Sequence, residues 1–176
     1  MKLRRLTWLF ANTRGAAVIE MALVAPVLAL GVIGIVDVSN AYSKKLALEQ
    51  GAQRAIEKIM NTTETATVEA TLANEAICQV NGMTGSTCNT SPITASNVTV
   101  TWRLDCTNSG GSVTTSTTTT SSTYDGWSCP AGSTSARYVQ VTVTDKYTPL
   151  FPIHFAGFNT TDSTYHLSAT AGVRTS

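Results

Sequence analysis

The sequence is poor in the side chains that catalysis and metal binding require. It contains two histidines, His154 and His166, and neither stands near a cysteine. No C-x-x-C, H-E-x-x-H or G-x-S-x-G motif occurs, and there is no glycine-rich phosphate-binding loop. Several aspartates stand singly, as turn-forming residues do: Asp105, Asp125, Asp145 and Asp162. We therefore expect a protein that is not an enzyme and that uses no metal and no cofactor.

Neither sign of charge dominates the chain, and acidic residues are absent from its beginning. The formal net charge is +1, which provides no electrostatic case for binding nucleic acid. In residues 1–15 the charged side chains are all basic: Lys2, Arg4, Arg5 and Arg14. Positive residues beside a membrane segment stay in the cytoplasm. We therefore expect a basic leader over residues 1–15, with the N-terminus inside and the rest of the chain outside.

Residues 16–36 form an apolar run that contains a single charged side chain, Glu20. As a helix this run would be roughly 31 Å long, which matches the hydrocarbon thickness of a bilayer. We therefore expect a transmembrane helix in which Pro26 produces a kink or loosens the backbone bonding, and from which Asp37 marks the exit. Because a carboxylate inside a membrane helix is costly, Glu20 points to a function.

The helix is predicted to continue outside the membrane over residues 37–62. Apolar side chains recur there at helical steps and form one stripe of an amphipathic helix: Val38, Ala41, Leu48, Ala52, Ala55 and Ile59. The stripe needs a partner surface, which is either the chain's own strands or another subunit. A second, shorter helix is predicted over residues 64–79, where apolar residues again follow a helical spacing.

The remainder of the chain, residues 63–176, is predicted to form an extracytoplasmic domain. Alternating apolar and polar residues predict strands over 97–104, 136–147 and 165–173. In the segment 107–123, thirteen of seventeen residues are Ser or Thr, a composition that predicts a loop because it cannot bury a core. The expected fold class is α+β, with a long N-terminal transmembrane helix extending outward, a second short helix and a small antiparallel sheet of about three or four strands.

Four cysteines lie on the exported side of the predicted membrane helix, where disulfides persist: Cys78, Cys88, Cys106 and Cys129. Four cysteines allow three pairings. We favour Cys78–Cys88 and Cys106–Cys129, because each of these disulfides closes a short local loop. A metal site is the alternative, and the absence of a C-x-x-C spacing argues against it.

Three aromatic side chains near the Ser/Thr-rich segment are candidates for contact with a surface or a glycan: Trp102, Tyr124 and Trp127. Trp102 lies on a predicted strand and is expected in the core. Trp127 lies between the Ser/Thr-rich segment and Cys129, so it is the better candidate for a surface contact.

Residues 15–26, GAAVIEMALVAP, resemble the N-terminus of the TadE-like pseudopilins of tight-adherence (Tad/Flp) pilus systems, which belong to the type IV pilin-like group. The glutamate that is fifth after the glycine and the proline further along match that family. Residues 147–152 and 169–174 also resemble the C-terminal part of these proteins. Met21 departs from the pattern, because major Flp pilins have tyrosine there and TadE-like proteins usually phenylalanine. The resemblance therefore favours a minor pilin over a major one.

The resemblance implies that a prepilin peptidase cuts after Gly15 on the cytoplasmic face, so that Ala16 becomes the first residue. Glu20 would then lie one helical turn from the new amine and could neutralise it, in its own subunit or in a neighbour. The implied location is the bacterial inner membrane, with a single span, an exported domain and incorporation in a pilus. The implied partners are the peptidase, other pilin or pseudopilin subunits and the inner-membrane assembly platform.

Two other interpretations of the N-terminus stay open. Residues 39–41, Ser-Asn-Ala, offer the small-x-small site of a secretory signal, although the apolar run is longer than is usual for one. The helix could also be an uncleaved anchor of an extracytoplasmic binding or assembly-scaffold protein, with Glu20 tolerated near the interface. The first residue of the chain in the membrane distinguishes these alternatives.

Overall fold

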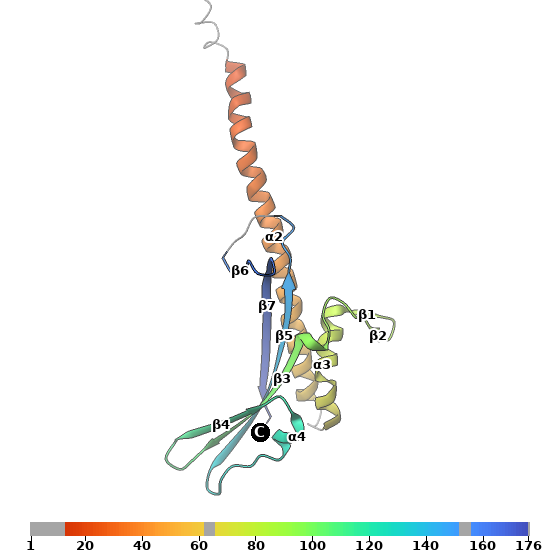
Figure 1. Cartoon of the computed structure of the whole chain (residues 1–176), viewed down its shortest axis with the longest axis vertical. Coiled ribbons are helices and arrows are strands. Elements are labelled where there is room, and N and C mark those ends of the chain that lie inside the picture. Colours follow the sequence, from red (N-terminus) through yellow and green to blue (C-terminus); the bar gives the residue numbers. More distant parts are fainter. Residues whose placement is uncertain (1–12, 62–65, 152–155, 176) are drawn as a thin grey trace, which may run out of the picture.

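The computed structural model describes residues 13–61, 66–151 and 156–175. A long N-terminal helix, shorter helices and antiparallel sheets confirm the predicted α+β class. The strands gather around the second half of the long helix, and its first half projects from the domain (Figure 1). The chain therefore presents a domain and a free helical segment, which have different surfaces.

Helix α2 spans Thr13–Asn61, and these 49 residues form it without a break. At about 1.5 Å per residue it is roughly 74 Å long. The large apolar side chains of its first half are exposed: Val18, Ile19, Met21, Leu23, Val24, Val27, Leu28, Leu30, Val32 and Ile35. By length and hydropathy α2 can cross a membrane, which fits a single-pass anchor.

The second half of α2 packs on helix α3, Ala66–Asn81, and on the sheet. The predicted apolar stripe is buried at four positions: Leu48, Ala52, Ala55 and Ile59. Val38, which belongs to the same predicted stripe, is instead 54% exposed. It lies one residue past Asp37, where the free segment of the helix meets the domain. The predicted stripe is therefore buried in the core of the chain from Leu48 onward.

The main sheet has five antiparallel strands in the order β4-β3-β5-β7-β6. Its three long strands lie where alternation predicts strands: β3 (Val98–Thr107), β5 (Thr134–Tyr147) and β7 (Thr164–Arg174). The two outer strands are β4 (Val113–Thr118) and the two-residue β6 (Phe158–Asn159). These two strands add to the three that the sequence predicts.

The two faces of the sheet differ in chemistry. On the face toward the helices, alternate residues of the long strands are buried: Trp102, Leu104, Val139, Val141, Val143 and Ala169. They form one core with residues of α2 and α3, including Leu48 and Leu72. The opposite face carries polar side chains, among them Thr142 and Thr170, whose hydroxyl oxygens are 3.0 Å apart. This division is the alternation that made the strands predictable.

The Ser/Thr-rich segment 107–123 is not the loop that its composition predicts. It contains β4, which pairs with β3 over residues 102–107, and the start of the short helix α4, Ser121–Asp125. Threonine is β-branched and suits an extended backbone. An edge strand whose side chains are mostly exposed needs backbone hydrogen bonds to one neighbour but no buried face, so a shortage of apolar residues does not prevent it.

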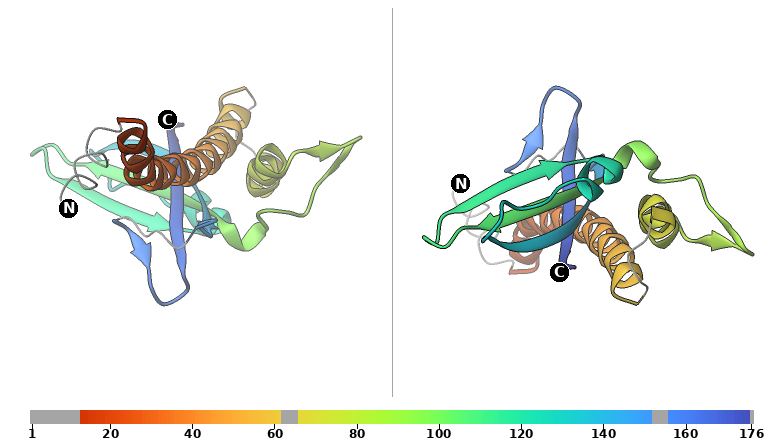
Figure 2. Two further views of the ribbon diagram at one scale, coloured as in Figure 1. Left: turned by 90° about the horizontal axis from the view of Figure 1, so that it is seen from above. Right: turned by 90° about the horizontal axis from the view of Figure 1, so that it is seen from below.

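The structure contains the disulfides Cys78–Cys88 and Cys106–Cys129, the pairing that loop length favours, with Cα–Cα distances of 4.9 and 5.5 Å. The first joins α3 to a small hairpin of β1 (Met83–Thr84) and β2 (Thr87–Cys88), which projects from the side of the domain (Figure 2). A 3-10 turn, η1 (Ala95–Asn97), leads from there into β3. The second disulfide joins β3 to the segment after α4.

Helices α2 and α3 come very close at Gly51. A Cβ added there would lie 2.5 Å from the Val80 side chain and 3.0 Å from the carbonyl oxygen of Ala76. The second atom belongs to the backbone, so the helices would have to shift apart. Glycine at this position therefore sets the distance between the two helices.

We expect Gly51→Ala to lower the free energy of unfolding by about 1–3 kcal/mol, the range typical of overpacked cores. The measurement is urea denaturation of the full chain in detergent, with tryptophan fluorescence as the probe of unfolding. Gln53→Ala, at an exposed position of the same helix, is the control and should change stability by less than about 0.5 kcal/mol. Equal free energies of unfolding for the two variants would show that α3 can move away from α2 at Gly51 without loss of stability.

Candidate functional site

The residues predicted for processing and assembly lie on the first turns of α2. Gly15 and Ala16 are in its first turn, and Glu20 follows about one turn later. The Glu20 side chain is exposed, and its exposed neighbours Ile19 and Met21 are apolar. In a membrane this segment would therefore place one carboxylate against lipid or against another helix.

Pro26 lies further along the same exposed half, and α2 continues through it. Because proline has no N–H, it cannot donate to the carbonyl of Ala22 one turn earlier. A kink at Pro26 stays a prediction. The backbone at this point has one hydrogen bond fewer than an ordinary helix, as the sequence implies.

A shallow groove of about 580 Å³ runs along α2 where its exposed half approaches the domain. Its lining consists of small and apolar residues together with one tyrosine: Leu30, Gly31, Gly34, Ile35, Val38, Ser39 and Tyr42. A Cβ added at Gly31 would meet nothing within 4 Å. Small residues of this kind allow a second helix to approach closely in a membrane.

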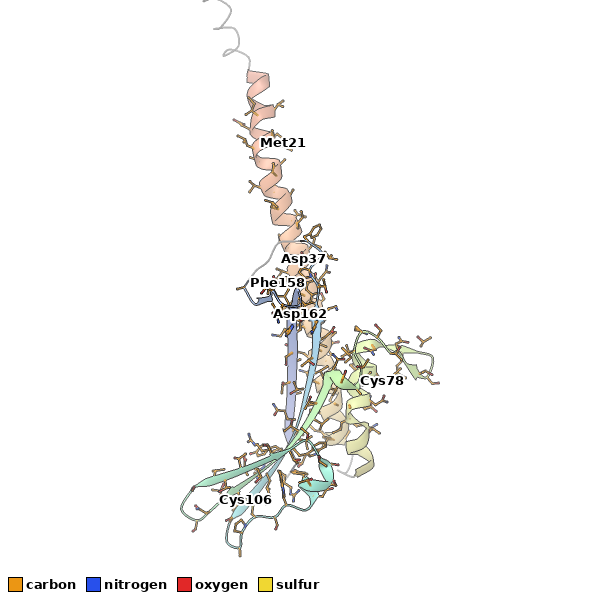
Figure 3. All side chains as sticks on the ribbon, in the orientation of Figure 1. Met21, Asp37, Cys78, Cys106, Phe158 and Asp162 are labelled. Atoms are coloured by element: carbon orange, nitrogen blue, oxygen red, sulfur yellow. A yellow bond between two sulfur atoms is a disulfide. The ribbon has the colours of Figure 1, made fainter. Side chains whose placement is uncertain are left out.

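Asp37 is the one acidic residue of α2 that is buried, with 4% of its surface exposed. Its Oδ1 accepts hydrogen bonds from the Tyr147 hydroxyl and the Leu150 N–H, both at 2.8 Å. Its Oδ2 accepts a hydrogen bond from the Phe151 N–H at 3.2 Å. The carboxylate therefore joins the end of the free segment of α2 to the loop after β5 (Figure 3).

The electrostatics of this contact favour the ionised form of Asp37. Burial acts to raise the pKa of the carboxyl group, but the hydrogen bonds from Leu150, Tyr147 and Phe151 outweigh it and hold the pKa below its ordinary value. Burial, followed by the hydrogen bond to Asp37, raises the pKa of Tyr147. The pair thus consists of a carboxylate acceptor and a neutral phenol donor at ordinary pH.

A second charged cluster lies on the flank of the same end of the domain. Asp162 accepts hydrogen bonds from Lys146 Nζ at 2.8 Å and from His166 Nε2 at 2.6 Å. These two hydrogen bonds, in that order, hold the pKa of the Asp162 carboxyl well below its ordinary range. His166 lies on β7, within the predicted third strand, and ties that strand to the preceding turn. His154 lies outside the described residues.

Sequence reasoning assigned Asp37 to the membrane exit and missed its binding partners. Tyr147 and Leu150 stand 110 and 113 positions later in the chain, so no local pattern links them to Asp37. The available signal was an unusual one, namely an isolated acidic residue directly after a long apolar run. The structure does not bring the four cysteines to this site, and Cys78 and Cys106 lie further from the exposed helix (Figure 3).

The burial of the three aromatic candidates for surface contact differs in part from the expectation. Trp102 is buried, as predicted. Tyr124, a candidate for contact with a surface or a glycan, is buried at 1% exposure, and its ring lies 4.6 Å from the guanidinium of Arg137. Trp127 is half-buried and packs edge-on against Tyr124, and its carbonyl oxygen accepts a hydrogen bond from Arg137. Tyr124 is therefore a core residue and not a contact residue.

Comparison with known proteins supports a family for the helix-bearing part of the chain. Residues 15–56 match the family model described as TadE-like protein. The matched range contains Gly15, Glu20, Pro26 and Asp37 and ends in the buried part of α2 at Ile56. The match supports a TadE-like protein of the Tad pilus system. No curated protein and no solved structure matches the chain significantly.

The contact at Asp37 should be lost in acid. Because the pKa of Asp37 is lowered in the folded chain, its stabilising effect is fully present above the ordinary carboxyl pKa of about 3.9 and disappears as the pH falls through the lower folded value. We expect the backbone amide signals of Leu150 and Phe151, measured by NMR on the full chain in detergent, to shift with a midpoint below about 3.9.

The substitution Asp37→Asn should remove this transition, whereas Asp145→Asn, which breaks an ion pair with Lys44 on the same domain, should retain it. An unaltered titration in Asp37→Asn would mean that another group controls the loop.

Proposed function

We propose that this chain is a minor pilin or pseudopilin of a Tad-type pilus, processed by a prepilin peptidase after Gly15 and acting in pilus assembly or adhesion. The observation that carries the proposal is an exposed apolar half-helix that bears Glu20 and falls within the TadE-like match at residues 15–56. A helix with this surface needs lipid before assembly, and it can exchange lipid for neighbouring helices in a filament. The chain itself has a structural role, and it is the substrate of the peptidase.

Cleavage after Gly15 is supported by the position and the chemistry of this residue. Gly15 lies in the first turn of α2, where a helix frays most readily. Glycine also destabilises helix and leaves the backbone open to close approach. A peptidase at the cytoplasmic face could therefore unwind this turn without disturbing the domain, which begins more than twenty residues later.

Cleavage would create a positive amine on Ala16 that needs a counter-charge. Glu20 lies four positions after Ala16, a rise of roughly 6 Å along the helix. In a medium of low dielectric constant an amine and a carboxylate at such a distance attract strongly. If the amine of one subunit meets Glu20 of a neighbour, the pair sets the axial position of one helix against the next. Gly31 and Gly34 would allow the same helices to approach closely.

The orientation follows from charge and is consistent with the disulfides. Basic residues before the apolar run favour a cytoplasmic N-terminus, which places the domain on the outer face of the bacterial inner membrane. The two disulfides fit an oxidising compartment. The partners that follow are the peptidase, other pilin or pseudopilin subunits and the assembly platform in the inner membrane.

We expect intact mass measurement of the chain, purified from membranes, to give a species that begins at Ala16 in cells with the prepilin peptidase and at Met1 in cells without it. Gly15→Leu should give the longer species in both, because a branched side chain blocks the close approach to the backbone. Gly31→Leu is a control outside the cleavage site and should still be cut. A chain that begins at Met1 in both strains would favour the alternative of an uncleaved anchor.

We expect Glu20→Gln to leave membrane insertion unchanged and to reduce the amount of the chain in sheared pili by about tenfold or more, since the loss of even about 1.4 kcal/mol per contact has that effect. The measurement is immunoblotting of membrane and pilus fractions. Glu49→Gln, which removes an acidic side chain from the domain half of α2, should behave as wild type. Normal incorporation of the Glu20 variant would exclude the amine–carboxylate pair.

A further inference from the structure

The end of the domain nearest the free half of α2 is formed by the chain that follows β5. Figure 1 shows the tip of β5 and the short strand β6 at the level where the exposed half of α2 meets the domain, with α3, β4, β1 and β2 further away. Figure 3 places Phe158, at the start of the last hairpin, close to Asp37 at this same end. We call residues 148–151 the post-β5 loop.

Asp37 fixes the height of the post-β5 loop along α2. The N–H groups of Leu150 and Phe151 donate to its two carboxylate oxygens at 2.8 and 3.2 Å. Asp37 directly follows the apolar run 16–36, which is long enough to cross the hydrocarbon layer once. The loop backbone is therefore within hydrogen-bond distance of the residue at which α2 leaves the bilayer.

The side chains that this loop presents are apolar. Leu150 is 64% exposed, and Pro149 and Phe151 are half-exposed. Residues 147–161 contain no Asp, Glu, Lys or Arg, and their one histidine, His154, lies outside the described residues. Among the described residues, charged side chains near this end pair on the flank, where Asp162 contacts Lys146 and His166 and Asp145 contacts Lys44.

The same level of α2 carries further exposed side chains of interfacial character. Val38 is 54% and Tyr42 is 62% exposed. Tyrosine is enriched where a membrane helix meets water, because its ring is apolar and its hydroxyl is polar. Val38 also lines a small pocket together with Pro149 of the loop, so the loop and this part of the helix adjoin at the exit point of α2.

We propose that the post-β5 loop rests in the interfacial layer of the bilayer that α2 crosses, with Leu150 inserted among the lipids, so that the domain lies against the membrane surface. The proposal rests on the membrane anchorage in the proposed function. Insertion removes an exposed leucine from water. The loop N–H groups at the same time satisfy the Asp37 carboxylate at a depth where few water molecules are available to do so.

The test uses methyl-labelled full chain in vesicles of phosphatidylethanolamine and phosphatidylglycerol that contain a lipid with a nitroxide near the top of its acyl chain. We expect the Leu150 methyl signals to be lost through paramagnetic broadening. Val113, on β4 at the distal end, is similarly exposed at 55% and should keep its signals. Val24, in the free half of α2, should lose them.

The outcomes separate the loop from the anchor. Loss of signal at Val24 with retention at Leu150 would overturn the proposal and leave the membrane anchor intact. Retention at Val24 would remove the anchor, and the proposal with it. A third outcome is that the Leu150 signals are retained at high protein density and broadened only when the protein is diluted in lipid. That result would show that a second copy covers the loop, and it would also overturn the proposal.

A pair of variants tests the role of Asp37 in the same vesicles. Asp37→Ala should restore the Leu150 signals in part while Val24 stays broadened, because the loop loses its tether to the helix. Asp145→Ala, which removes the ion pair with Lys44, should leave Leu150 broadened. Complete broadening of Leu150 in the Asp37 variant would show that the loop reaches the lipid without this tether and would overturn the mechanism.

Discussion

Three hydrogen bonds to the Asp37 carboxylate connect the end of the apolar first half of α2 to the last residue of β5 and the loop after it. Asp37 has left the apolar run and cannot be buried alone, because an unpaired charge in a protein interior is strongly unfavourable. The Tyr147 hydroxyl and two backbone N–H groups satisfy it and lower its pKa. The orientation of the domain relative to the free half of α2 depends on this contact and on the core below it.

The continuous helix lets one element serve two environments. Before Asp37 its apolar side chains point outward all around, as suits lipid or neighbouring subunits. From Leu48 onward the apolar side chains narrow to one stripe, which the sheet and α3 cover. Gly51 brings α3 close on one side, and Val139, Val141 and Val143 of β5 provide the surface of the sheet. The change of pattern along one helix lets the same element fit a membrane anchor in its first half and pack in a domain in its second.

Periodicity in the sequence predicted the helices and strands that bury one face in the core. The helical stripe from Leu48 to Ile59 and the alternation in β5 are examples, and both were located from the sequence. β4 was missed because the shortage of apolar residues in 113–118 favours a loop, although threonine suits an extended backbone and pairing with β3 supplies the backbone hydrogen bonds. The hydrogen bonds at Asp37 could not be predicted from the sequence, because their partners come together only in the tertiary fold. Cysteine pairing was accessible, because short loop closure depends on sequence distance alone.

The separation of Asp37 from its partners has a consequence for how the chain is made. Tyr147 and Leu150 follow Asp37 by 110 and 113 positions, and β7, which pairs with β5, comes later still. A chain that emerges with its N-terminus first therefore has its helix in place long before the carboxylate finds its donors. No shortened product that ends before Tyr147 can close this contact. The junction between helix and domain is thus completed only after Tyr147 and Leu150 have been synthesised, and its presence distinguishes a chain that extends past them from one that stops before them.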